Sequence, residues 1–535
     1  MVRPFLLFIL VACVIAGVWY RLGRPLAMPP SPLAAGEKLT CVSYAPFHGE
    51  QAPFTWGLHI PDEQIESDLE RLEPLTSCVR TYSAMGPQGR IAALAGKHGL
   101  KVLQGIWLNR NRAENRREIE SALRLTRQHP GVIEAFIVGN EVLLRGELPA
   151  SAIKTYLEEV KRRSGLPVTY ADVWEFWLKT PELASATDFV TIHILPYWED
   201  DPVPAKDAVA HVREIREGLQ RAFSGKDILI GEVGWPSQGR MRAGALPSPA
   251  NQAFVLSGVV AAAKAGGWKV NLIEAFDQPW KRLLEGTVGG YWGLFSDTTL
   301  APKFRFGVPV SNEPEWRQAA GLGIGIALFV FLSATLGNRH RTWRQDVLIA
   351  VIALASGLTF GAAAIALPMD SVVEGDRLRS LGMFALAAVV PLAASFALAR
   401  GDGIASFELA LDPSRWRSKD LIPLMLAGLL AATMIAAMHV ALGLVFDPRY
   451  KDFPLAALTG PVAALAMLAF AGTRASPEPG RADLIGAAVL AGSGLFIIAN
   501  EGISNWQALL FAALLVALAL TLLQRPDERS SAQAT

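Results

Sequence analysis

Two glutamates in the first half of the chain stand at the ends of β-rich runs. Residues 133–139 lead into Glu141, and residues 228–232 end at Glu232. If both runs are strands of one barrel, their carboxylates reach the same mouth from different strands. Such a pair can cleave a glycosidic bond, because one carboxyl group protonates the leaving oxygen while the other stabilises or attacks the anomeric carbon. The two glutamates therefore predict chemistry on a carbohydrate.

Aromatic residues are crowded just after the ends of these and neighbouring runs. Sugar rings have apolar faces and polar rims, so flat aromatic side chains are suitable platforms for them. Any one of these residues could equally be core packing, but their crowding after strand ends favours a sugar-binding surface. The residues are Trp107, Trp174, Phe176, Trp177, Tyr197, Trp198, Trp235, Phe276, Trp280, Tyr291 and Trp292.

Short β-rich runs alternate with charged, amphipathic helical patterns through residues 38–310. Eight strand–helix repeats over about 270 residues fit a (β/α)8 TIM barrel of the α/β class. A doubly wound open sheet is the alternative, but no glycine-rich phosphate loop follows the first strand, which disfavours folds that bind a phosphate cofactor. The expected strands are 40–45, 77–82, 101–107, 133–139, 168–171, 189–193, 228–232 and 271–276.

The second half of the chain has a different composition. From Gly321 onward Leu, Ala, Val, Gly and Ile dominate, and seven apolar stretches after residue 317 are long enough to cross a bilayer. Buried helices of a soluble protein are the alternative, which so many consecutive spans disfavour. Residues 484–499 form the shortest span of the set. The other expected spans are 318–337, 346–367, 380–399, 421–444, 454–472 and 505–523.

A further apolar run, residues 4–19, follows Met-Val-Arg at the start of the chain. A cleaved signal peptide is one interpretation, but no small-x-small cleavage site follows closely, which favours an uncleaved anchor. A segment with four prolines comes next and predicts a spacer. The expected domains are an anchor at 1–24, a linker at 25–37, a barrel at 38–310, a seven-helix α-helical membrane domain at 318–523 and a tail at 524–535.

Basic residues in the connections between spans indicate the orientation. Arg339, Arg341 and Arg344 fill one connection without an acidic residue, and a later one contains Arg400, Arg415, Arg417 and Lys419. Connections rich in Lys and Arg stay in the cytoplasm. The alternation predicts that both termini are cytoplasmic and that residues 38–310 lie outside the inner membrane, in the periplasm.

Net charge and cysteine content exclude some classes. The formal net charge is +1, which gives no electrostatic case for a nucleic-acid partner. Three cysteines are too few for a disulfide framework. If Tyr44 and Arg80 point into a common site, alternation along the strands places Cys41 and Cys78 on opposite sides. The sequence therefore predicts two buried free thiols.

The motifs around these residues resemble glycoside hydrolase family 17, which comprises β-1,3-glucanases and glucanosyltransferases with a (β/α)8 barrel. The resemblance covers nearly all of residues 40–298. It rests on four ordered motifs: VRTY at 79–82, VGNEV at 138–142, GEVGWPSQG at 231–239 and EAFDQPWK at 274–281.

The resemblance implies roles for individual residues. Glu141 matches the general acid/base, Glu232 the nucleophile, and Asn140 the residue that hydrogen-bonds the sugar 2-hydroxyl. His193 stands where an asparagine is usual in this family. Neither a metal nor a cofactor is implied. The further residues expected around the substrate are Tyr44, Arg80, Tyr82, Trp174, His193, Tyr197, Trp235, Glu274, Phe276, Lys281 and Glu285.

Several functions fit these features. The layout resembles the membrane-embedded bacterial branch of the family, which acts in rhizobial β-(1,3),(1,6)-glucan synthesis. This favours a retaining glucanosyltransferase. An endo-β-1,3-glucanase is the alternative, and an inactive glucan-binding scaffold is a third hypothesis. A nucleotide-sugar synthase is disfavoured, because the membrane half lacks the acidic metal-binding motifs that such enzymes need. The expected partners are a β-glucan, the lipid bilayer and, as a candidate, a membrane β-glucan synthase.

Overall fold

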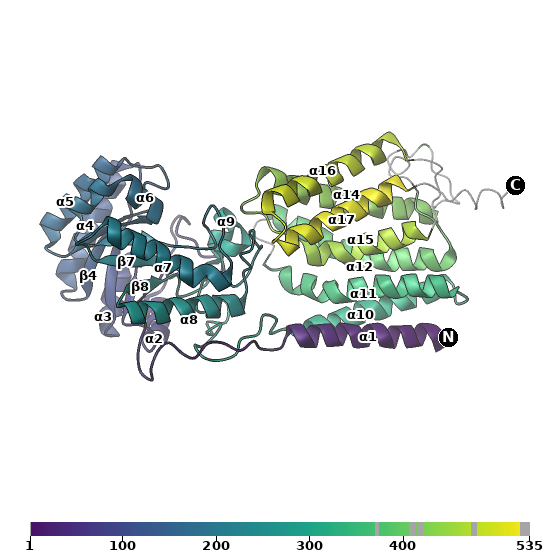
Figure 1. Cartoon of the computed structure of the whole chain (residues 1–535), viewed down its shortest axis with the longest axis horizontal. Coiled ribbons are helices and arrows are strands. Elements are labelled where there is room, and N and C mark those ends of the chain that lie inside the picture. Colours follow the sequence, from purple (N-terminus) through teal and green to yellow (C-terminus); the bar gives the residue numbers. More distant parts are fainter. Residues whose placement is uncertain are drawn as a thin grey trace. The chain divides into compact units, whose positions relative to one another are not determined.

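The computed structural model describes residues 2–369, 374–405, 412, 414, 421–471 and 479–524. It divides into two compact units (Figure 1). The barrel unit comprises residues 26–239 and 244–310, and the helical unit comprises residues 1–25, 240–243 and 311–535.

The barrel unit is built on eight parallel strands that close in chain order, with β1 paired to both β2 and β8. This confirms the predicted (β/α)8 fold class. The eighth strand begins and ends earlier than the sequence predicts. The strands are β1 Cys41–Ser43, β2 Cys78–Arg80, β3 Lys101–Ile106, β4 Ile133–Asn140, β5 Val168–Val173, β6 Val190–His193, β7 Ile228–Val233 and β8 Lys269–Leu272.

The strands form because their sequences are apolar and suited to burial on both faces. Every residue of β7 is buried, as are all residues of β4 except Glu134. Parallel strands that are covered on both faces typically have near-continuous apolar sequences of this kind. The covering helices are α2 Asp62–Leu72, α3 Ile91–Lys97, α4 Arg112–Gln128, α5 Ala150–Ser164, α6 Trp174–Lys179, α7 Ala205–Ala222, α8 Pro249–Gly266 and α9 Arg282–Gly289, with short 3₁₀ turns η1 Gly86–Arg90, η2 Pro181–Ala186 and η3 Pro279–Lys281.

Local signals fix the ends of the covering helices. The Asn111 side chain accepts hydrogen bonds from the first turn of α4, and Ser248 caps α8 in the same way. Gly165 and Gly267 end α5 and α8 in the left-handed conformation. A side-chain oxygen at the start and a glycine just past the end are the usual helix boundaries. These boundaries leave the loops after the strands free to form the barrel mouth.

Cys41 and Cys78 form a disulfide, so the prediction of two free thiols is wrong. β1 and β2 pair in parallel with Val42 opposite Val79. This register puts the two cysteines side by side, with their Cα atoms 4.4 Å apart. The bridge therefore joins two neighbouring strands of the barrel.

The error arose from assigning Tyr44 to the barrel interior. The Tyr44 hydroxyl donates to Asp68 Oδ2 on α2 at 2.7 Å, so this side chain points outward. Ser43 points inward, since its Oγ lies 3.1 Å from the Tyr82 hydroxyl oxygen. Alternation along the strand then places Cys41 on the same side as Ser43.

Replacing both bridged cysteines by serine should destabilise the barrel. The bridge closes a loop with a sequence separation of 37, and a loop of this length is worth about 3–4 kcal/mol of unfolding free energy. Chemical denaturation of the full chain in detergent, followed by tryptophan fluorescence, measures the change. Cys13→Ser is the matched control, because Cys13 is a free, exposed cysteine. An unchanged midpoint in the double variant would contradict the prediction.

The helical unit contains α1 and a series of apolar helices from the second half of the chain. Among the described residues, seven helices are long and apolar enough to cross a membrane. α15, with 16 residues, is the short one, whereas the sequence pointed to 484–499, which lies in the 21-residue α16. The helices are α1 Val2–Leu22, α10 Trp316–Gly337, α11 Trp343–Ala366, α12 Glu374–Arg400, α14 Leu421–Phe446, α15 Leu455–Phe470, α16 Arg481–Glu501 and α17 Trp506–Leu523.

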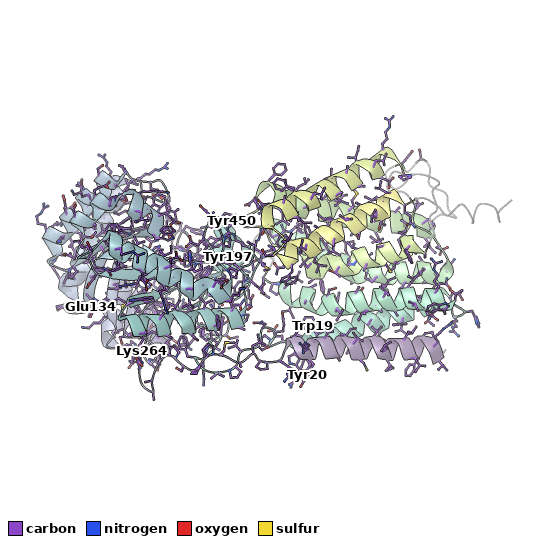
Figure 2. The ribbon with its side chains drawn as sticks, in the orientation of Figure 1. Trp19, Tyr20, Glu134, Tyr197, Lys264 and Tyr450 are labelled. Carbon is purple, nitrogen blue, oxygen red and sulfur yellow. A yellow bond between two sulfur atoms is a disulfide. The ribbon has the colours of Figure 1, made fainter. Side chains whose placement is uncertain are left out.

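The N-terminal helix packs into this unit. Ile15 of α1 is fully buried, and a Cβ on Gly357 of α11 would lie 2.3 Å from its Cδ1. Arg3 forms an ion pair with Asp346 of α11 at 2.8 Å. Trp19, near the end of the same helix, is also buried (Figure 2). Small residues let helix backbones approach closely, so the absence of a side chain at Gly357 allows α1 to pack closely against α11.

Some of the residues used in the topology prediction lie outside the part of the chain that the structure describes. Arg415, Arg417 and Lys419, and residues 525–535 of the expected tail, lie outside the described ranges.

Candidate active site

Two carboxylates and an imidazole meet at the mouth of the barrel. Glu141 directly follows β4, Glu232 belongs to β7, and His193 ends β6. One carboxylate oxygen of each glutamate and one nitrogen of His193 lie within 4.8 Å of one another. The structure thus brings together the two glutamates that the sequence singled out and adds the histidine between them.

Glu232 is held by donors from the barrel interior. Arg80 Nη1 lies 2.6 Å from its Oε1, and the Tyr82 hydroxyl donates to the same oxygen at 3.0 Å. Burial alone would raise the pKa of Glu232, but its electrostatic interactions with His193, Arg80 and Lys281 lower it below its usual value. The site therefore favours the carboxylate form of this residue.

Asn140 is fixed by the same arginine. Arg80 Nη2 donates to Asn140 Oδ1, and Arg80 Nη1 donates to the carbonyl oxygen of Gly231 at 3.0 Å. A guanidinium group can only donate, so the Oδ1 atom must face Arg80. The amide group Nδ2 is then the atom of Asn140 that can donate to a ligand.

Glu141 sits on a tight turn that two residues of β5 support. Its φ is +52°, a left-handed conformation that is uncommon outside glycine. The next turn of chain is tied down by Leu143 N–H, which donates to the Tyr170 hydroxyl at 2.9 Å and to Asp172 Oδ2 at 3.2 Å. Leu144 N–H donates to the same carboxylate oxygen at 3.4 Å. Asp172 and Tyr170 thus hold the loop that carries Glu141.

Sequence reasoning missed Asp172 and Tyr170. Burial raises the pKa of Asp172 to about 6, with the nearby Glu141 charge acting in the same direction. The available signal was an acidic residue directly after the predicted strand 168–171, since such residues are rarely buried without a polar partner. The partner itself becomes visible only in the structure.

A second ionic cluster lies on the β8 side of the mouth. Lys281 Nζ contacts both oxygens of Glu274 at 2.8 Å. Burial raises the pKa of Glu274 despite this lysine, and it raises the pKa of Glu285 to about 7. All three residues were expected near the substrate. In the structure, the Lys281 ammonium group interacts with both Glu274 and Glu285, and it also lowers the pKa of Glu232.

Tyr44 does not join the carboxylates. Its hydrogen bond to Asp68 places it between the barrel and α2, whereas the sequence placed it among the residues around the substrate. The physical reason is the one that explains the disulfide: Tyr44 directly follows β1, and its side chain points outward.

The expected aromatic platforms divide into two groups. Trp177 is buried, donates to the carbonyl oxygen of Thr191 at 2.7 Å and packs on Tyr170 and Phe223, so it belongs to the core. Tyr197, Trp235 and Phe276 are also buried, and their sugar contacts stay predictions. The half-buried rings are Trp107, Trp174, Phe176, Trp198, Trp280 and Tyr291.

The half-buried tryptophans come from loops after several strands. Trp174 Nε1 donates to Glu199 at 3.2 Å, and Trp198 stacks on Trp292 with 6.5 Å between ring centroids. Trp280 forms an edge-to-face contact with Phe54, which is exposed. These rings follow β5, β6 and β8, at the end of the barrel where the glutamates lie.

Comparison with known proteins gives consistent matches to the barrel. Residues 41–293 match the BtgE/BtgC glycoside hydrolase domain. A glucan 1,3-beta-glucosidase of Candida albicans is 28% identical over 260 residues, which cover 44% of this chain and 84% of that protein. The glucan 1,3-beta-glucosidase of Saccharomyces cerevisiae is 26% identical over 256 residues, covering 44% of this chain and 82% of the relative.

Among solved structures, an active-site mutant of the Rhizomucor miehei beta-1,3-glucanosyltransferase in complex with laminaritriose is similar. It shares 23% sequence identity with a TM-score of 0.45, and the match covers 51% of this chain and 98% of that one.

Proposed function

Because the barrel of this chain belongs to glycoside hydrolase family 17, we propose that the protein is a membrane-anchored, retaining β-1,3-glucanosyltransferase. Glu232 is the nucleophile and Glu141 is the acid/base. The observation that carries this proposal is the approach of their carboxylate oxygens to within 4.8 Å. Retaining enzymes hold the two carboxyl groups about 5–5.5 Å apart, whereas inverting enzymes leave about 6.5–9.5 Å for a water molecule.

The reaction follows in two balanced steps. Glu232 attacks the anomeric carbon while the glycosidic bond breaks and the leaving oxygen takes the Glu141 proton. A sugar hydroxyl then attacks the anomeric carbon of the glucosyl ester, its proton passes to Glu141, and the Glu232 carboxylate is released. Asn140 Nδ2 is placed to donate to the sugar 2-hydroxyl, because Arg80 occupies the Oδ1 atom.

The choice of a sugar as acceptor is supported by the half-buried aromatic rings of the mouth, notably Trp174, Trp198 and Trp280. Rings that hold a sugar on the leaving-group side favour that sugar over water. Hydrolysis of β-1,3-glucan is the second candidate, since it uses the same two carboxylates.

Incubating the purified protein with a defined β-1,3-glucan oligosaccharide tests the proposal. Products longer than the substrate, with β configuration retained, should appear early in the reaction. Exclusively shorter products at millimolar substrate would establish the hydrolase instead, and linkage analysis would identify which glucan is built or branched.

A periplasmic position for the barrel, with both termini in the cytoplasm, is supported by two observations. The Cys41–Cys78 disulfide fits an oxidising compartment, because cytoplasmic thiols are generally kept reduced. Arg339 and Arg341 lie in the connection between α10 and α11, and Arg344 lies in the first turn of α11, where basic residues favour the cytoplasmic side. The substrate would then be a glucan outside the inner membrane, and the bilayer and a membrane β-glucan synthase would be the partners.

Reporter fusions test this orientation. A reporter that is active only in the periplasm should work when it is fused near Glu313, before α10, and fail when it is fused after Arg341. The reason is that the basic connection between α10 and α11 favours the cytoplasmic side of the membrane. The opposite pattern of activity would overturn the topology.

The electrostatics of Glu232 predict a change in the pH profile. Arg80→Met removes a positive charge that lowers the pKa of Glu232, so this pKa should rise. Because the nucleophile must be ionised, the acidic limb of the kcat/KM profile should move to higher pH, while Arg80→Lys should move it less. The pH dependence of kcat/KM over the acidic range measures the shift. An acidic limb that stays in place in Arg80→Met would contradict the charge effect.

A further inference from the structure

His193 lies between the two glutamates with no exposed surface of its own. Its Nδ1 atom is 2.8 Å from Glu141 Oε1, and its Nε2 atom is 3.7 Å from Glu232 Oε1. Within the described part of the chain, Nε2 has no hydrogen-bond partner. The two nitrogens of one buried ring thus face the two glutamates that the proposed reaction needs. Because the ring has no exposed surface, the substrate contact expected from the sequence is disfavoured.

The register of the strands places this ring beside the nucleophile. A Cβ on Gly231 would lie 2.3 Å from Thr191 Cγ2 and 3.4 Å from His193 Cδ2. β6 and β7 pair so that His193 lies opposite Glu232. Gly231 therefore leaves room for Thr191, whereas an added Cβ would only reach ordinary contact distance from the imidazole.

Protons restrict how the ring can bond. An ionised Glu141 oxygen at 2.8 Å accepts a hydrogen bond, so Nδ1 must carry a proton. The carboxyl groups that face the ring come from three other elements: Glu141 after β4, Asp172 on β5 and Glu232 on β7. A ring that is protonated at both nitrogens donates to Glu141 and places a positive charge near Glu232, whereas a neutral ring donates to Glu141 and places no charge there.

We propose that His193 is a positioning residue that determines which oxygen of Glu141 carries the transferable proton. Nδ1–H occupies Oε1, so the acid proton resides on Oε2. Among the described residues, Oε2 has no protein partner, and the Glu141 side chain is 22% exposed. This oxygen therefore remains available to the glycosidic oxygen in the first step and to the acceptor hydroxyl in the second.

This inference rests on the proposed roles of Glu141 and Glu232, and its test uses side chains that imitate one nitrogen at a time. Asparagine places its amide N–H close to the position of Nδ1, whereas glutamine, one carbon longer, places its own near Nε2. His193→Asn should therefore keep kcat on a β-1,3-glucan oligosaccharide within about fivefold of wild type. His193→Gln and His193→Ala should each lose about 10²-fold in kcat, the contribution of a well-placed general acid, with KM changed by less than about threefold.

An activated substrate separates positioning from folding. An aryl laminaribioside with a strongly acidic phenol needs no proton on its leaving oxygen, so the burst of phenol release reports on ester formation alone. This burst should stay within about threefold of wild type in all three full-length variants. A burst that falls by the same factor as turnover of the oligosaccharide, or an asparagine variant as impaired as the alanine variant, would overturn the inference.

The aryl substrate also separates this inference from the proposed function. A hydrolase cleaves it as well as a transferase does, so the His193 variants are informative whichever acceptor the wild-type protein uses. Absence of longer products from wild type, with the burst pattern intact, would reject the transferase and leave the role of His193 standing.

Discussion

Glu232→Gln should reduce kcat on β-1,3-glucan oligosaccharides by about 10⁴-fold or more, because no other group can form the glycosyl ester. Glutamine preserves the size of the side chain, and its carbonyl oxygen can still accept from Arg80 Nη1, which lies 2.6 Å from the native carboxylate. The loss should therefore appear in turnover while the variant remains folded.

The control for this variant is Glu214→Gln on α7, whose side chain is exposed. It should leave both turnover and stability unchanged. Residual activity of Glu232→Gln within tenfold of wild type, after deamidation back to glutamate has been ruled out by mass, would show that Glu232 is not the nucleophile.

Glu141→Gln should have the second largest effect, a loss of about 10²–10⁴-fold in kcat on unactivated glucan. The amide cannot supply a proton to the leaving oxygen or accept one from the acceptor. With an aryl laminaribioside of acidic phenol the first step needs no proton, so the burst of phenol should persist while later turnover stalls. Rapid-mixing measurements of phenol release distinguish these two phases.

Glu134→Gln is the matched control for Glu141→Gln. Glu134 belongs to the same strand, β4, but its side chain is exposed (Figure 2). This control should behave as wild type with both substrates. If Glu141→Gln lost the burst together with steady-state turnover, the acid/base assignment would have to be abandoned.

The barrel could be predicted from sequence because its strands are short apolar runs with polar ends. β4 and β7 show this most clearly: their interiors are buried and each leads to a glutamate at the mouth. Parallel strands place their carboxyl ends at one edge, so the meeting of Glu141 and Glu232 followed from strand order alone.

The direction of side chains on β1 could not be predicted in the same way. With only three residues, Cys41–Ser43, this strand carries too little alternation to reveal its inner face. The structure shows Ser43 inside and Tyr44 outside, which reverses the expectation for both Tyr44 and the cysteine pair.

Contacts across strands also lie beyond sequence patterns. Asp172 supports the turn after Glu141, and His193 reaches two glutamates from β6, because the register of β4, β5, β6 and β7 brings their ends together. A polar residue in an apolar strand signals that some partner exists, without indicating which one.

Hydropathy predicted the positions of the helices in the second half of the chain more accurately than it predicted where these helices begin and end. Gly480 N–H donates to Asp483 at 3.0 Å near the start of α16, and this helix continues to Glu501. These polar residues dilute the apolar signal, so the sequence suggested a shorter span than the structure contains. Apolar content identifies the middle of a span, whereas capping residues determine its limits.

Trapping the covalent intermediate tests the central claim of a retaining mechanism on Glu232 most directly. A 2-deoxy-2-fluoro laminaribiosyl fluoride carries a good leaving group, and its fluorine slows hydrolysis of the ester once it has formed. After incubation and proteolysis, mass spectrometry should find one added disaccharide on the peptide that contains Glu232. A label on Glu141 instead, or an unlabelled protein that releases products of inverted configuration from unmodified glucan, would contradict the mechanism.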